Sequence, residues 1–123
     1  MSAFRLLFNP LWRRNWRLVL LCLLAAVSWF AFTPSTPQSG LPHIDKVQHL
    51  LAFASLALVA SLGWPPAPRT AALITVGLMA YGLFIELMQT QLPTRTGSMA
   101  DWLTDGVGIG LGLLLHRALR PRG

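Results

Sequence analysis

The sequence has little of what soluble proteins carry in quantity, and charged residues are its clearest shortage. Only 11% of its 123 residues are charged and 54% are hydrophobic, whereas soluble domains have about 25% charged residues. The single cysteine, Cys22, excludes a scaffold of intrachain disulfides, and the apolar content excludes a disordered chain. The length allows one domain. This composition predicts a small integral membrane protein.

Acidic residues are scarce as well. The chain has 4 Asp and Glu residues against 10 Lys and Arg residues, which gives a formal net charge of +6. Such a balance can indicate nucleic-acid binding, but here the cations lie between long apolar runs and not along one polar face. We therefore predict no nucleic-acid partner, and we expect membrane lipids to surround the protein.

Four apolar runs predict an all-α fold, an integral membrane bundle of four transmembrane helices. Each run is near the lower limit of the ~17–25 residues that cross a bilayer, and segments rich in Pro and Gly separate the runs. The first run resembles a signal peptide, but it ends in bulky aromatic residues where cleavage needs small ones. We therefore predict a retained span. The expected spans lie at about residues 18–33, 46–64, 70–89 and 100–116.

The distribution of the cations predicts the orientation of these spans. Eight Arg residues and no acid fall in the basic N-terminal segment 1–17, the loop near Arg69 and the basic tail 117–123. The opposite side of the four-span membrane domain, residues 18–115, has two cations and all four acids. Because Lys and Arg favour the cytoplasmic side, we predict that both termini are cytoplasmic.

Polar residues gather at the predicted outer ends of spans two, three and four. Successive spans alternate in direction, so these ends lie at one depth, and residues three or four apart share a helix face. An unpaired charge inside a bilayer costs at least ~2.5–3.5 kcal/mol, so we expect these side chains to meet one another. The predicted cluster comprises Asp45, Lys46, His49, Glu86, Gln89, Arg95, Asp101 and Asp105.

Three motifs in this region resemble the VanZ-like family of small membrane proteins. They are Asp45-Lys46-x-x-His49, Glu86-x-x-Gln89, and Arg95 with Ser98, Asp101 and Gly108, all within residues 43–115. The sequence departs from the family at Asp105, where Asn is usual. The resemblance implies a multi-pass protein of the bacterial cytoplasmic (inner) membrane, tied to the cell envelope. It also implies a link to resistance against the glycopeptide antibiotic teicoplanin.

The cluster has several interpretations. We predict that it binds or modulates an envelope component, and that Ser98 belongs to the same binding site. One alternative is a small enzyme acting on a lipid-linked or peptidoglycan-related substrate, with Glu86 or Asp101 as catalytic base. Another is a proton-coupled small multidrug transporter, which is disfavoured because span one has no acid. A clamp that fixes helix register, through hydrogen bonds of about 1–2 kcal/mol, would also explain these residues.

No metal and no cofactor is predicted. His49 and the acids offer nitrogen and oxygen ligands for a divalent cation, but the sequence has no His-Glu-x-x-His motif. The fourth span carries two overlapping Gly-x-x-x-Gly pairs, which predict close helix packing within the bundle or between subunits of a homo-oligomer. These glycines are Gly106, Gly108, Gly110 and Gly112.

Overall fold

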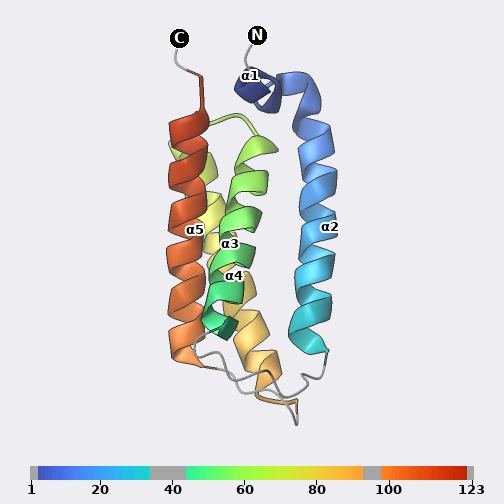
Figure 1. Ribbon diagram of the computed structural model, residues 1–123, viewed down its shortest axis with the longest axis vertical. Coiled ribbons are helices and arrows are strands. Elements are labelled where there is room, and N and C mark those ends of the chain that lie inside the picture. Colours follow the sequence, from blue (N-terminus) through green and yellow to red (C-terminus); the bar gives the residue numbers. More distant parts are fainter. Residues whose placement is uncertain (1–2, 34–43, 93–97, 122–123) are drawn as a thin grey trace.

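Four long helices form a bundle, with a short helix and a 3-10 turn before them (Figure 1). The computed structural model describes residues 3–33, 44–92 and 98–121. All the elements in these ranges are helical, so the predicted all-α class is confirmed. In chain order they are α1 (Ala3–Leu7), η1 (Pro10–Trp12), α2 (Arg13–Phe32), α3 (Ile44–Leu62), α4 (Pro68–Gln89) and α5 (Met99–Leu119).

Local sequence signals set the starts of the last two helices. Pro68 opens α4, a position that suits proline because the first helical N–H has no intrahelical partner. Ser98 is the N-cap of α5, where its hydroxyl accepts the backbone N–H of Asp101 at 3.0 Å. This cap fixes where α5 begins, and it therefore fixes Asp101 in the first turn.

The long helices alternate in direction along the bundle. Both chain ends lie at one end of the molecule, and the last turn of α2 lies at the other (Figure 1). That second end also holds the start of α3, the end of α4 and the start of α5. The up-and-down arrangement therefore places the polar ends of three helices next to one another.

Helices α3 and α5 make the most extensive contact in the bundle, and two glycines permit it. A Cβ at Gly108 would lie 2.6 Å from the carbonyl oxygen of Leu50, and one at Gly112 would overlap the carbonyl of Ala54. Only glycine lets the two backbones approach this closely. A Cβ at Gly106 would lie 3.3 Å from Sδ of Met79, so three of the four predicted packing glycines have contacts within the chain, whereas a Cβ added at Gly110 would meet no neighbouring helix within 4 Å.

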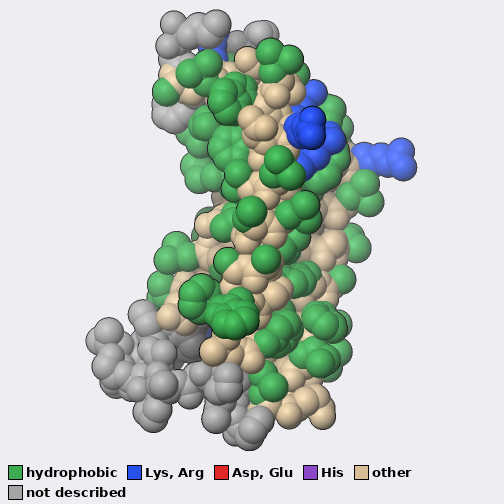
Figure 2. Space-filling view, turned by 90° about the vertical axis from the view of Figure 1, so that its right-hand side faces the viewer, with side chains coloured by type: hydrophobic (Ala, Val, Ile, Leu, Met, Phe, Trp, Pro, Cys, Tyr) green, Lys and Arg blue, Asp and Glu red, His purple; other side chains and the backbone are tan. Residues whose placement is uncertain are grey.

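The bundle has an apolar exterior and a partly polar interior. Trp29 is 71% exposed and Val76 is 67% exposed, whereas Glu86 is 6% exposed and Asp105 is fully buried. In Figure 2 apolar side chains cover most of the face formed by α2, and Lys and Arg side chains gather toward the end that carries both termini. Lipid outside and paired polar groups inside are what a membrane environment requires.

Length and composition identify two candidate membrane spans among the described helices, where the sequence predicts four. They are Pro10–Phe32 and Pro68–Gln89, which overlap the first and third expected spans. The apolar part of α3, Lys46–Leu62, is shorter. In α5 the acids of the first two turns lower the mean hydropathy. These helices indicate a membrane protein, and the full topology stays a prediction.

Candidate functional site

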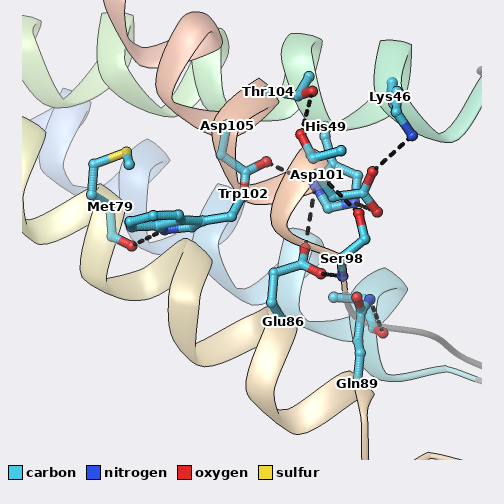
Figure 3. A network of polar contacts seen from close by, with 12 residues as sticks. Lys46, His49, Met79, Glu86, Gln89, Ser98, Asp101, Trp102, Thr104 and Asp105 are labelled. Carbon is cyan, nitrogen blue, oxygen red and sulfur yellow. Dashed lines mark hydrogen bonds and ion pairs between the residues drawn. The ribbon is translucent and has the colours of Figure 1, made fainter.

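His49 lies at the centre of a cluster built from three helices (Figure 3). Its Nδ1 atom is 2.7 Å from Oδ1 of Asp105 and 3.9 Å from Oε1 of Glu86. Its Nε2 atom is 3.9 Å from Oδ2 of Asp101. One imidazole on α3 is thus surrounded by three carboxylates from α4 and α5, and all three are buried.

Helical spacing explains why these side chains face inward together. Asp101 and Asp105 are four residues apart on α5, and Lys46 and His49 are three apart on α3, so each pair shares a face. The Lys46 ammonium lies 3.3 Å from Oδ1 of Asp101. With a side chain 38% exposed, Lys46 closes the outer edge of the cluster.

Glu86 links the end of α4 to the start of α5. Its Oε2 atom accepts the backbone N–H of Ser98 at 2.8 Å, and Ser98 is the residue whose hydroxyl caps α5. A second link lies deeper, where the Trp102 indole N–H donates to the carbonyl of Met79 at 3.0 Å. The two links fix the position of the α5 carboxylates relative to Glu86.

Two buried carboxylate oxygens lack a hydrogen-bond partner among the described residues. They are Oε1 of Glu86 and Oδ2 of Asp105. Leaving a buried acceptor without a partner costs about 1–3 kcal/mol, and more for a charged group. The described cluster holds three carboxylates, with the Lys46 ammonium and the His49 imidazole beside them. Such an arrangement is costly for a clamp that only fixes register.

Gly82 makes room for the most deeply buried carboxylate. A Cβ at this position would lie 2.8 Å from Oδ2 of Asp105 and 3.4 Å from the Phe53 ring. Any larger residue at position 82 would push Asp105 away from the centre of the cluster. Gly82 thus supports the site, although nothing in the sequence assigns it that role.

A cavity of about 440 Å³ borders His49, and no residue of α5 lines it. It lies between α2, α3 and α4, and its walls are mainly apolar. Gln89 lines its polar edge and donates its side-chain N–H to the carbonyl of Ala31, at the end of α2, at 2.9 Å. The lining residues are Val27, Phe30, Ala31, Gln48, His49, Ala52, Phe53, Ile85 and Gln89.

Most of the residues expected in the site are brought together. Six form one contact network, and Gln89 lies beside it on the cavity wall. The six are Lys46, His49, Glu86, Ser98, Asp101 and Asp105. Arg95 and the side chain of Asp45 lie outside the described residues. The sequence analysis missed Gln48 and the whole contribution of α2.

The apolar exterior, the two candidate spans and the buried polar cluster define this chain as a small helical membrane protein with an internal polar site. Residues 4–120, nearly the whole chain, match the family model described as VanZ/LLP1. The chain therefore belongs to the VanZ/LLP1 family, and the resemblance stated from the motifs is confirmed. No curated protein and no solved structure matches it.

Proposed function

We propose that this VanZ-like protein is an integral protein of the bacterial inner membrane that binds or modulates a cell-envelope component at the His49 cluster. One observation carries the proposal, which is the cavity that joins apolar walls to a polar edge beside that cluster. Its volume of about 440 Å³ is within the range of small-molecule sites, roughly 300–1,000 Å³.

The cavity and cluster together suit an amphiphile. Apolar side chains of α2, α3 and α4 offer a surface for a lipid chain, and His49 and Gln89 mark where a polar headgroup would begin. The carboxylates accept hydrogen bonds, which favours a headgroup rich in hydroxyl, amide or amine donors. A lipid-linked or peptidoglycan-related component has this combination of an apolar tail and such donors.

The proposal includes the orientation of the protein. Four spans with both termini in the cytoplasm put the cluster at the outer face of the inner membrane, where envelope precursors are used. The eight Arg residues of the two chain ends and the loop near Arg69, on the side opposite the cluster, support this orientation. A site at the outer face also accommodates the link between the family and teicoplanin-type resistance.

Binding to reconstituted protein tests the proposal. The parent, Asp101→Asn and Thr104→Val are inserted into phospholipid vesicles and titrated with a radiolabelled lipid-linked peptidoglycan precursor. Thr104 is a matched control because its hydroxyl bonds only to its own helix, at the Ala100 carbonyl. We expect saturable binding by the parent and the control, and affinity at least about tenfold weaker for Asp101→Asn. Equal binding by all three would show that the site assignment is wrong.

A second candidate function is supported by the unpartnered oxygens of Glu86 and Asp105 beside His49. A buried carboxylate next to an imidazole is suited to general acid–base chemistry, so a small membrane enzyme for the same substrate class is the alternative. Chromatography of the precursor after incubation with the vesicles separates the two. Release of a product by the parent and not by Glu86→Gln favours the enzyme, and unchanged precursor favours the binding protein.

A further inference from the structure

The geometry points to a site for a divalent transition-metal ion at His49, Glu86 and Asp105. Each side chain offers one ligand atom, and these atoms lie within 4.8 Å of one another. No other group of this kind is found in the described part of the chain. The site overlaps the one proposed above, but cation binding is measured without any envelope ligand, so the two proposals can fail separately.

The two unpartnered oxygens are the independent observation that indicates a ligand. Glu86 and Asp105 are each more than nine-tenths buried, and each presents one carboxylate oxygen that no described donor satisfies. In Figure 3 both side chains point toward the His49 ring from different helices. Packing alone gives no reason to bury two carboxylate oxygens without a donor. A cation gives one, because it satisfies both.

The charges of the cluster lead to the same conclusion. Among the described side chains, Lys46 pairs with Asp101, and Glu86 and Asp105 together carry two negative charges when His49 is neutral. Protonating His49 would remove one of them, whereas one divalent cation would remove both. Neutral imidazole is also the form that binds metals. One divalent ion would therefore balance the charge of these two carboxylates, and its binding at Nδ1 would displace the proton shared by Nδ1 and Oδ1 of Asp105.

The distances need only modest adjustment to fit a metal. Bonds of about 2.0–2.2 Å place neighbouring ligand atoms roughly 3.0–3.5 Å apart. Nδ1 of His49 lies 2.7 Å from Oδ1 of Asp105 and 3.9 Å from Oε1 of Glu86. Shifts of a few tenths of an ångström would bring both pairs of atoms into that range. Gly82 leaves the space in which Asp105 can turn.

The ligand types select the class of metal. One nitrogen and two carboxylate oxygens suit zinc and other first-row ions, whereas calcium and magnesium prefer oxygen alone. Asp101 lies 3.9 Å from Nε2, the ring nitrogen that would not bind the metal. Metal-binding imidazoles commonly have a carboxylate on that side, which orients the ring. Three protein ligands would leave a fourth position open, and one of the three, His49, also lines the neighbouring cavity.

Zinc binding by the purified full chain, free of any affinity tag, tests the site. The parent is stripped with a chelator, dialysed against Zn²⁺ and measured by mass spectrometry of the metal and by competition with a chromophoric chelator. We expect about one zinc per chain. His49→Ala and Asp105→Asn should weaken binding by about 10–100-fold. His116→Ala is the matched control, since it removes a buried histidine from the opposite end of the bundle.

The outcomes separate a metal from its alternative, a proton held by the same carboxylates. A parent that retains no more zinc than a buffer blank overturns the site, as does equal binding by the parent and Asp105→Asn. If His49→Ala does not fold, the nearly isosteric Asp105→Asn and Glu86→Gln variants still decide. The absorption spectrum of the Co²⁺-loaded parent then reports ligation directly, and a spectrum of hydrated Co²⁺ alone contradicts it. Zinc binding without precursor binding would instead reject the proposed function.

Discussion

At the scale of single residues, Asp105 is the position where the sequence departs from the family motif named above, in which Asn is usual. It is fully buried, it bonds His49 through one oxygen, and its other oxygen has no described donor. The usual Asn would keep the first contact through its own oxygen and would replace the unpartnered oxygen with a neutral amide. We therefore expect the aspartate to stabilise the fold less than Asn would, as is common where a residue serves binding.

This comparison leads to a stability prediction. In the presence of a chelator, Asp105→Asn should keep or raise the free energy of unfolding, by up to about 2 kcal/mol, because it removes a buried charge. Asp105→Ala should lower it by a similar amount, because it leaves His49 without this partner. Thermal unfolding in detergent measures both. A clear loss of stability in Asp105→Asn would mean that the negative charge itself holds the three helices together.

The residues of the cluster could be predicted because polar residues in an apolar chain are conspicuous and helix periodicity fixes their faces. Lys46, His49, Glu86 and Asp101 were found this way. Gln48 was missed because it lies on a different face of α3 and carries no charge. The sequence offered His49 and the acids as possible metal ligands but did not favour a metal, because no local spacing links three residues that come from three helices.

At the scale of elements, the contact between α3 and α5 positions the site. Gly108 and Gly112 bring the two backbones together, and the same approach brings His49 to Asp105. The glycine pattern predicted close packing, but it did not specify the partner helix, because glycine spacing carries no information about what lies opposite. The position of α2 was equally hidden, since its contact with Gln89 is made by a backbone carbonyl.

Two glycine substitutions test this account of the packing. Gly112→Leu should reduce folded protein in the membrane to less than about a tenth of the parent level, because the side chain would overlap the backbone of α3. Gly110→Leu should leave the amount unchanged, because no described atom lies near that position. Detergent extraction and size-exclusion chromatography measure both amounts. If Gly110→Leu changes the oligomeric state alone, the predicted homo-oligomer contact lies there.

At the scale of the whole molecule, the apolar exterior and the buried acids indicate a membrane protein. Two of the described helices meet the length and composition expected of a membrane span. The sequence predicts four spans because the segments of α3 and α5 also contain long apolar runs, each with a polar end. In α5 the polar residues Asp101 and Asp105 are buried, and Lys46 and His49 at the start of α3 lie against them.

Labelling of single cysteines tests the proposed orientation. Cys22→Ser gives a background without cysteine, and Arg69→Cys and Thr90→Cys place a thiol on exposed residues at opposite ends of α4. A membrane-impermeant maleimide should label Thr90→Cys in intact cells and should label Arg69→Cys only after lysis. The reverse pattern, or labelling of both in intact cells, would contradict an outward-facing cluster.

The central claim is that the His49 cluster is a working site and not a clamp, and one paired measurement tests it most directly. A sensitive Gram-positive host expresses the parent, Glu86→Gln, Asp101→Asn or the control Thr104→Val, and both membrane abundance and teicoplanin susceptibility are measured. The account predicts that the parent and control protect, while both cluster variants are equally abundant and do not protect. Full protection by equally abundant cluster variants, or their disappearance from the membrane, would contradict it.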